Sequence, residues 1–109
     1  MKPLTFKGSS LADLKAFPGS AMREAGYQLN RIQLGEEPHD WKPMSTVGAG
    51  VMEIRIQDQA GAFRVVYVAK FSAGVYVLHC FQKKTQATSR ADLALAQKRY
   101  RELMQELRP

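Results

Sequence analysis

The chain has 109 residues, of which 45% are hydrophobic and 24% are charged, values that are ordinary for a soluble globular protein. We expect one domain over residues 1–109, with one modest core and no room for a large cofactor-binding fold. The single cysteine, Cys80, excludes an intrachain disulfide framework and is typical of a reducing compartment, so we expect a cytoplasmic protein. The chain starts without a signal-like apolar segment and has no apolar run near the roughly 20 residues of a membrane span, so no membrane partner is expected.

The positive charge is concentrated in the second half of the chain. Sixteen Lys and Arg residues stand against ten Asp and Glu residues, a formal net charge of +6. Residues 1–50 have a net charge of +1, and residues 51–109 have a net charge of +5. A surplus of this size favours a polyanionic or acidic partner. Solubility is the alternative explanation, and composition alone does not separate the two.

The N-terminal third predicts one short strand and two helices. Residues 2–6 are compatible with a strand at a sheet edge, because Pro3 cannot donate to a ladder. Apolar residues three positions apart predict a short helix over residues 11–17. A second helix is expected from about residue 20 to residue 34, where apolar side chains recur at intervals of three and four and mark one face.

A long loop and three strands are expected next. Residues 36–50 contain two Pro and two Gly and predict an ordered loop, anchored by Trp41 and Met44. Residues 51–57 alternate between apolar and polar, which predicts a strand with one buried face. Residues 63–70 and 75–81 are rich in Val, Tyr and Phe on both faces, so we expect two central strands joined as a hairpin.

The last element predicted is a helix that begins at Ser89. Asp92 follows three residues later, in a spacing that resembles a capping box. Apolar residues then repeat at intervals of three and four as far as Leu107. The element order β-α-α-β-β-β-α predicts an α+β fold in which helices cover one face of a small antiparallel sheet.

Polar residues on the first long strand suggest a functional face. Glu53, Arg55 and Gln57 point away from the predicted core. If the hairpin pairs symmetrically about residues 59–60, Arg55 lies directly opposite Arg64. Like charges so placed destabilise a sheet by up to about 1 kcal/mol. Glu53 would relieve this repulsion in part and an anionic ligand would relieve it better, and such local conflicts tend to occur at functional sites.

The last strand ends in a basic segment with neutral hydrogen-bonding neighbours: Gln82, Lys83, Lys84 and Thr85. These side chains can engage phosphate oxygens. A lysine pair alone is also common at a solvated strand end. Together with Arg55 and Arg64, however, the two lysines would form a four-cation cluster at one sheet edge, and this cluster is more specific for a phosphodiester ligand than any single member.

Aromatic and histidine side chains allow two interpretations each. Four aromatic residues are candidates for stacking on RNA bases, with core packing as the alternative: Trp41, Tyr67, Tyr76 and Phe81. Core packing is favoured for Tyr76 and Phe81. His79 could act as a general base, but it alternates with apolar residues and is better explained as a packed histidine, beside Cys80 as a small core residue. The chain has no zinc-ligand spacing, so we expect neither a metal ion nor another cofactor.

Five segments carry a resemblance to a known family: DWKPM (Asp40–Met44), VGAGVMEIRI (Val47–Ile56), FRVVYVAKF (Phe63–Phe71), VYVLHCFQKKTQAT (Val75–Thr88) and RADLALAQKR (Arg90–Arg99). Across them the chain resembles the phage-derived, HigB-like branch of the RelE/ParE toxin superfamily. The resemblance implies a small antiparallel sheet with two N-terminal helices and one C-terminal helix. It also implies a type II toxin that cleaves messenger RNA, usually on the ribosome, without a metal ion. Its expected partners are the ribosome with mRNA and a cognate antitoxin, usually a helix-turn-helix protein.

The resemblance also implies roles for individual residues. Arg64 matches a strand arginine of RelE-like enzymes, and Lys84 matches a basic residue after the last strand, with Lys83 beside it. Arg55 matches a lysine on the preceding strand. Arg90 stands where some relatives carry a tyrosine, which leaves the identity of the general base open.

The chemistry of RNA cleavage agrees with these residue types. Attack by the 2′-hydroxyl builds negative charge on the phosphate, and preorganised cations stabilise that charge as it develops. We expect Arg64 to bind the scissile phosphate, so that Arg64→Ala abolishes growth arrest while the protein still folds. The candidate catalytic residues are Arg64, Lys83 and Lys84, and the candidate RNA contacts are Arg55, Gln82, Thr85 and Tyr67.

Two alternatives stay open. ParE-like relatives inhibit DNA gyrase with the same scaffold, and a nucleic-acid-binding module without catalysis would also be basic. The fold cannot separate these functions. Lys83 and Lys84 beside Arg64 favour RNA cleavage, because gyrase inhibition would not need a sheet edge suited to phosphate. An antitoxin would cover this edge, or displace an element there, with complementary acidic charge.

Overall fold

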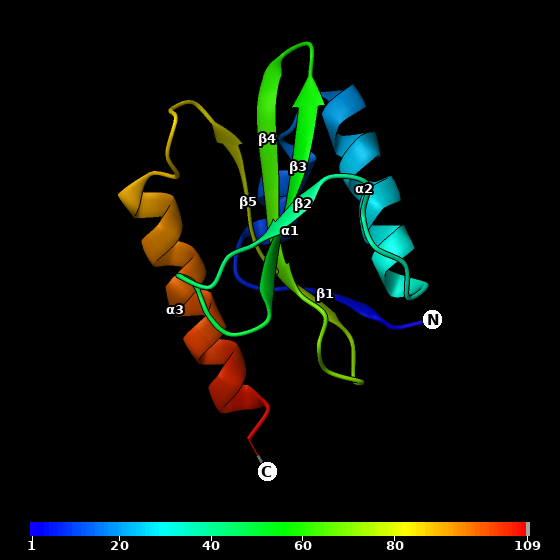
Figure 1. Cartoon of the computed structure of the whole chain (residues 1–109), viewed down its shortest axis with the longest axis vertical. Coiled ribbons are helices and arrows are strands. Elements are labelled where there is room, and N and C mark those ends of the chain that lie inside the picture. Colours follow the sequence, from blue (N-terminus) through cyan, green and yellow to red (C-terminus); the bar gives the residue numbers. More distant parts are fainter. Residues whose placement is uncertain (109) are drawn as a thin grey trace.

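Five strands and three helices make up residues 1–108, the part of the chain that the computed structural model describes (Figure 1). They run in the order β1 (Leu4–Phe6), α1 (Ser10–Lys15), α2 (Gly19–Gln33), β2 (Trp41–Pro43), β3 (Val51–Asp58), β4 (Gly61–Val68), β5 (Val75–Lys83) and α3 (Arg90–Glu106). The predicted α+β class, with two N-terminal helices and one C-terminal helix, is confirmed. The predicted start of the last helix is also confirmed, because the Ser89 side chain accepts a hydrogen bond from the backbone N–H of Asp92.

The sheet is mixed, with the strand order β1-β5-β4-β3-β2. Strands β3, β4 and β5 form the expected antiparallel meander. Strand β1, however, pairs with β5 in the parallel direction and places Phe6 opposite Val77, so the expectation of a wholly antiparallel sheet was wrong. A three-residue strand carries no signal of its own direction, because that direction is decided by contacts with the other end of the chain.

Strand β2 lies inside the segment that was expected to be a loop. Its three residues pair with β3 and place Trp41 opposite Ile54 and Lys42 opposite Glu53. Because β2 is at the edge of the sheet, Pro43 is tolerated there although it cannot donate to a ladder. The loop prediction was wrong for these residues because the surrounding Pro and Gly dominate the composition of the segment.

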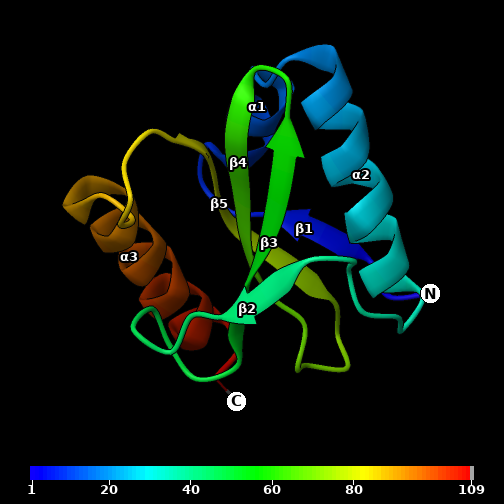
Figure 2. The ribbon, with the colours of Figure 1, turned by 45° about the horizontal axis from the view of Figure 1, so that its top comes forward.

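Helices cover both faces of the sheet, as Figures 1 and 2 show. Helices α1 and α2 pack on one face with residues such as Ile54 and Val65. Helix α3 packs on the opposite face with residues that include Val66 and Leu78. The expectation that all helices lie on one face was therefore wrong. The physical reason is that β4 and β5 are apolar on both faces, and each apolar face needs its own covering layer.

The register of the central strands positions the basic residues. The β3–β4 hairpin turns at residues 59–60 and places Arg55 opposite Arg64, as predicted. The β4–β5 pairing places Arg64 opposite Phe81 and Ala62 opposite Lys83. Arg55, Arg64 and Lys83 therefore share the sheet face that α3 covers in part.

Candidate functional site

A shallow hollow of about 750 Å³ lies where β3, β4 and the segment after β5 meet. We call it the cationic hollow, and its lining residues are Arg55, Ala62, Arg64, Lys83, Lys84, Thr85 and Gln86. Four of these residues are cations and none is acidic. A concave surface lined by charges of one sign attracts a ligand of the opposite sign.

Five of the predicted site residues line this hollow: Arg55, Arg64, Lys83, Lys84 and Thr85. Arg64 is only 7% exposed, so most of its guanidinium is removed from water. Within residues 1–108, the side chains of Arg55, Lys83 and Lys84 form no ion pair. The charges of these three residues are therefore available to a ligand.

The other two predicted site residues, Tyr67 and Gln82, point elsewhere. Tyr67 follows Arg64 by three positions, and an odd separation along a strand places two side chains on opposite faces. It packs in the core under α2, where burial, with a further contribution from the charge of Glu37, raises the pKa of its phenol to about 12. Gln82 donates from Nε2 to the carbonyl of Ala60 at 3.0 Å and so braces the β3–β4 turn.

The aromatic candidates for base stacking also lie away from the cationic hollow. Trp41 and Tyr67 line a second hollow of about 330 Å³ between α2 and the sheet. Phe81 is buried under α3 and Tyr76 is half-buried against the same core, as their predicted core packing requires. Of the described residues that line the cationic hollow itself, none is aromatic.

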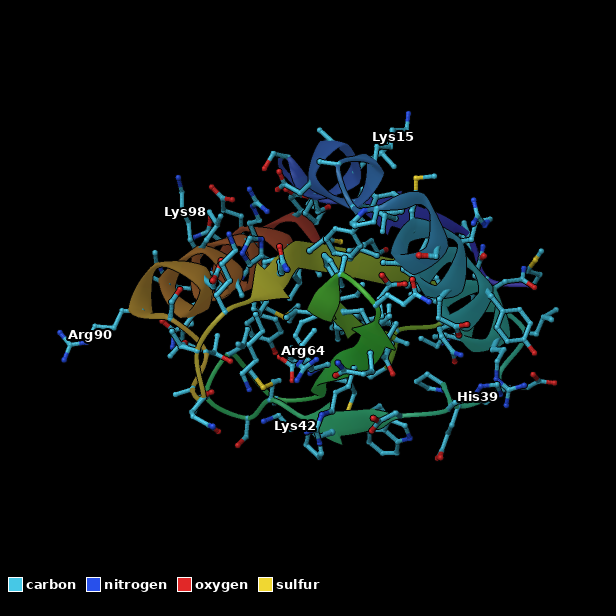
Figure 3. All side chains as sticks on the ribbon, turned by 90° about the horizontal axis from the view of Figure 1, so that it is seen from above. Lys15, His39, Lys42, Arg64, Arg90 and Lys98 are labelled. Atoms are coloured by element: carbon cyan, nitrogen blue, oxygen red, sulfur yellow. The ribbon has the colours of Figure 1, made fainter. Side chains whose placement is uncertain are left out.

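A buried carboxylate adjoins the hollow and was not predicted as a site residue. Glu53 is fully buried, and its Oε1 lies 3.6 Å from Nε of Arg64 and 3.9 Å from Nζ of Lys42. Within the described residues, neither carboxylate oxygen has a hydrogen-bond partner, and Arg64 Nε has none. In Figure 3 Lys42 lies on the edge strand β2, which β3 separates from the strand of Arg64, whereas Arg90 and Lys98 point outward from α3.

The sequence indicated the positions of Glu53 and Lys42 only in part. Glu53 was noted as a neighbour that would relieve the Arg55–Arg64 repulsion, but its place in the alternation suggested an outward-facing side chain. Lys42 was hidden because β2 was not predicted, and only the pairing of β2 with β3 places it opposite Glu53.

Burial and neighbouring cations lower the pKa of Lys83. Desolvation is the largest cause that lowers the pKa of Lys83, and the positive charges of Arg64, Lys42 and Arg55 lower it further. The negative charge of Glu53 acts in the opposite direction. Lys83 therefore loses its proton at a lower pH than an isolated lysine, while an arginine in this environment keeps its charge.

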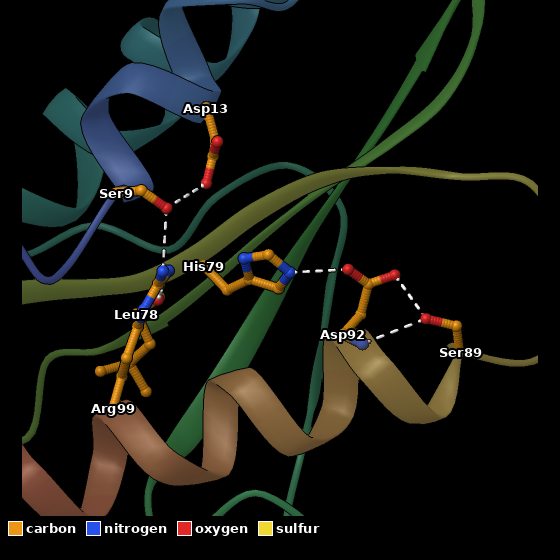
Figure 4. A network of polar contacts seen from close by, with 7 residues as sticks. All are labelled: Ser9, Asp13, Leu78, His79, Ser89, Asp92 and Arg99. Carbon is orange, nitrogen blue, oxygen red and sulfur yellow. Dashed lines mark hydrogen bonds and ion pairs between the residues drawn. The ribbon is translucent and has the colours of Figure 1, made fainter.

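His79 belongs to a separate polar network between β5 and α3 (Figure 4). Its Nε2 lies 2.7 Å from Oδ1 of Asp92, whose Oδ2 accepts the hydroxyl of Ser89 at 2.7 Å. The imidazole is buried and stacks on Phe81 with a centroid distance of 4.9 Å. The prediction that His79 is a packed histidine is therefore confirmed.

Arg99 joins three elements in the neighbouring part of this network. It donates from Nη1 to the carbonyl of Leu78 on β5 and from Nη2 to Oγ of Ser9 before α1, both at 2.9 Å. The Ser9 hydroxyl in turn donates to Asp13 at 2.8 Å. Both Nη atoms of Arg99 are thus hydrogen-bonded, and the side chain links α3 to β5 and to the start of α1.

The described residues contain neither a reactive thiol nor a cluster of metal ligands. Cys80 is buried, and desolvation, with a smaller contribution from Asp13, raises the pKa of its thiol to about 12. Among residues 1–108, no three His, Cys, Asp or Glu side chains gather in a way that would hold a metal ion. No helix in this part of the chain is both long and apolar enough to cross a membrane.

Comparison with known proteins assigns the chain to a family. No curated protein matches the chain. The family model described as "Phage derived protein Gp49-like (DUF891)" matches residues 12–101, and this range includes every residue that lines the cationic hollow. The chain therefore belongs to the phage-derived Gp49-like family, which in general terms is a family of RelE/HigB-like toxins.

Proposed function

We propose that this protein is the toxin of a type II toxin–antitoxin system and that it cleaves messenger RNA on the ribosome as a metal-independent endoribonuclease. Membership of the Gp49-like family supports the toxin role. The observation that carries the RNA-cleaving activity is the cationic hollow, in which four cations converge and no acid lines the surface. A surface of this kind suits the phosphodiester backbone of RNA.

The chemistry requires charge stabilisation more than any covalent step by the protein. The RNA 2′-hydroxyl attacks the neighbouring phosphorus, and the bond to the 5′-oxygen of the next nucleotide breaks. Negative charge develops on the phosphate oxygens during this step, and cations already in place stabilise it without reorganisation. Arg64 is suited to the scissile phosphate because a guanidinium offers a planar fork that matches phosphate oxygens.

The remaining cations have supporting roles in this proposal. Lys83 and Lys84 stabilise the developing charge, and Arg55 orients the backbone from the opposite strand. The ribosome would hold the message in line for attack, and orientation of this kind supplies a large part of many rate enhancements. A modest site on a small protein then suffices for cleavage.

The same hollow would be the target of control by an antitoxin. The expected partner is a helix-turn-helix protein that covers the cationic hollow, or displaces an element beside it, with complementary acidic charge. The proposal places the protein in the cytoplasm, where mRNA and ribosomes are found.

Brief expression in cells followed by primer extension on abundant mRNAs tests the proposal. New cuts inside translated regions are expected for the wild-type protein. Intact mRNA together with DNA damage would instead indicate gyrase inhibition, and neither effect would indicate a binding module without catalysis. Either of the last two results would overturn the proposed activity.

The matched variants are Arg64→Lys, Arg64→Ala and Lys98→Gln. Arg64→Lys keeps a positive charge next to buried Glu53 but removes the fork, whereas Arg64→Ala leaves that carboxylate with Lys42 alone. Both variants are expected to lose growth arrest. Lys98 is exposed on α3 and should tolerate its substitution. Full toxicity of a folded Arg64→Ala protein would contradict the role of Arg64.

A further inference from the structure

One charged side chain in the sheet is placed where it costs stability. Glu53 lies in β3 and is fully buried, and neither of its oxygens has a hydrogen-bond partner among the described residues. Removing a carboxylate from water is unfavourable unless it is well paired and hydrogen-bonded. The distances to Arg64 and Lys42, 3.6 and 3.9 Å, bring opposite charges together but are too long for hydrogen bonds.

Packing does not explain why this position is charged. Glu53 pairs with Val66, and Val51, two residues earlier on β3, lies on the same face in the apolar core under α3. An apolar side chain at position 53 would continue that core, and apolar replacements of buried ion pairs are often neutral or stabilising. Conflicts between stability and local chemistry of this kind tend to lie at functional sites.

The contacts of Arg64 indicate what the carboxylate does. The guanidinium is held on one side by its Nη1 hydrogen bond to the Phe63 carbonyl at 3.0 Å, and on the Nε side it faces Glu53. The remaining N–H groups are left for the cationic hollow, which Arg64 lines. A guanidinium that is hydrogen-bonded on one side and faces an opposite charge on the other is oriented before the ligand arrives, and such preorganisation is what a phosphate site requires.

We propose that Glu53 is the positioning residue of the cationic hollow: its buried carboxylate holds the Arg64 guanidinium and draws the Lys42 ammonium to the same oxygen, so that both cations are oriented toward an RNA phosphate. Lys42, on β2, does not itself line the cationic hollow, and through Glu53 it would add a fifth cation beside it. The identity of the ligand rests on the proposed function, but the orientation of Arg64 does not.

Glu53→Gln separates positioning from simple electrostatic attraction. Loss of a negative charge next to the cations makes the hollow more positive, so Coulomb attraction alone predicts tighter RNA binding and undiminished cleavage. Positioning predicts a different pattern, in which KM is unchanged or lower and kcat falls by about 100-fold, the effect of a small misplacement of a catalytic group. The control is Glu102→Gln, which makes the same charge change on the exposed surface of α3 and should leave both constants unchanged.

A second measurement does not depend on cleavage. The Nε–H proton of Arg64, observed by NMR in the free protein, should exchange slowly with water because it is buried against Glu53. In Glu53→Gln we expect exchange to accelerate by about tenfold or more, equivalent to about 1.4 kcal/mol of lost protection. Glu102→Gln should exchange at the wild-type rate. If wild-type protein fails to cut mRNA, the proposed function fails while this experiment still decides the role of Glu53.

A third variant keeps the proposal testable if Glu53→Gln does not fold. Glu53→Asp retains the charge and withdraws the carboxylate by one methylene, so it should fold, show faster Arg64 Nε–H exchange and lower kcat in the same direction. Wild-type exchange and wild-type kcat in a folded Glu53→Gln or Glu53→Asp protein would overturn the positioning role.

Discussion

Arg64 and Arg99 are equally buried and yet serve different purposes. Each is 7% exposed. Arg99 donates to the Leu78 carbonyl and to Ser9, and so links α3 to β5 and α1 (Figure 4). Among residues 1–108, Arg64 donates only to the carbonyl of Phe63, its neighbour in the chain, and its Nε has no hydrogen-bond partner; its side chain lines an open hollow. Arg99 is therefore a structural tie, whereas Arg64 keeps donors for a ligand.

The difference shows that burial alone does not identify a functional arginine. Native proteins satisfy nearly all their buried polar groups, so a buried donor or acceptor without a partner needs an explanation. Both Nη atoms of Arg99 have a hydrogen-bond acceptor, whereas Nε of Arg64 and the carboxylate of Glu53 have no hydrogen-bond partner among the described residues; near Arg99, Nδ1 of His79 also has none. An unpartnered guanidinium N–H that faces an unpartnered buried carboxylate is therefore a better marker of the site than burial alone.

The same substitution at both positions tests most directly whether Arg64 and Arg99 have different roles. Arg64→Lys should lower mRNA cleavage by about 100-fold or more, because the bidentate fork is lost, and cost less free energy of unfolding than Arg99→Lys, because a cation still faces the buried Glu53. Arg99→Lys should lower the free energy of unfolding by about 2 kcal/mol, since one ammonium cannot bridge both acceptors, and leave cleavage by the folded protein intact. Urea denaturation and a ribosome-bound cleavage assay measure the two effects. Equal stability losses with equal cleavage would remove the distinction.

The salt dependence of RNA binding tests whether a cation of the hollow contacts a phosphate group. Lys84 is exposed and lines the cationic hollow, so Lys84→Gln should remove one phosphate contact. The slope of log K against log salt concentration should then fall by about 0.7, the value for one contact with a single strand. Lys98→Gln on α3 is the control with the same charge change. Identical slopes for the two variants would show that only net charge matters.

The pH dependence of the site follows from the lowered pKa of Lys83. If Lys83 acts as a cation, RNA binding and cleavage weaken as the pH rises through this lowered pKa, earlier than for an ordinary lysine. Lys83→Arg should keep activity to higher pH, because arginine stays protonated. pH profiles of the two proteins measure this shift. Wild-type activity that rises over the same range, and is absent in Lys83→Arg, would instead identify Lys83 as a base.

The smallest effect is expected in the structural region of β5. With a thiol pKa of about 12, native Cys80 should resist iodoacetamide at pH 8, because only about one thiol in ten thousand is ionised at four pH units below the pKa. Mass spectrometry of native and urea-unfolded protein measures the modification. Rapid labelling of the native protein would mean that this part of β5 opens far more readily than its packing indicates.

Local sequence was sufficient for the central part of the site. The alternation of β3 and the turn at residues 59–60 determine a register, and that register places Arg55 opposite Arg64. Lys83 and Lys84 follow the adjacent strand and reach the same hollow. The same period-two rule could also have excluded Tyr67, which is an odd number of residues from Arg64.

Other parts of the site could not be predicted in this way. Glu53 has the alternation of a solvent-facing residue, and it is buried because neighbouring elements cover that face of the sheet. Lys42 lies in a segment rich in Pro and Gly, and its place beside Glu53 comes from the pairing of the three-residue strand β2. Both positions depend on contacts between distant segments.

Periodicity and turn chemistry are local properties, and they were enough to predict the α+β class, the long elements, the antiparallel meander and the proximity of Arg55, Arg64, Lys83 and Lys84. The tertiary structure decided the parallel direction of β1, the separation of α3 from the other helices and the burial of Glu53 beside Arg64 and Lys42. These features follow from which apolar faces need cover and which residues then lose water, and no short stretch of sequence contains that information.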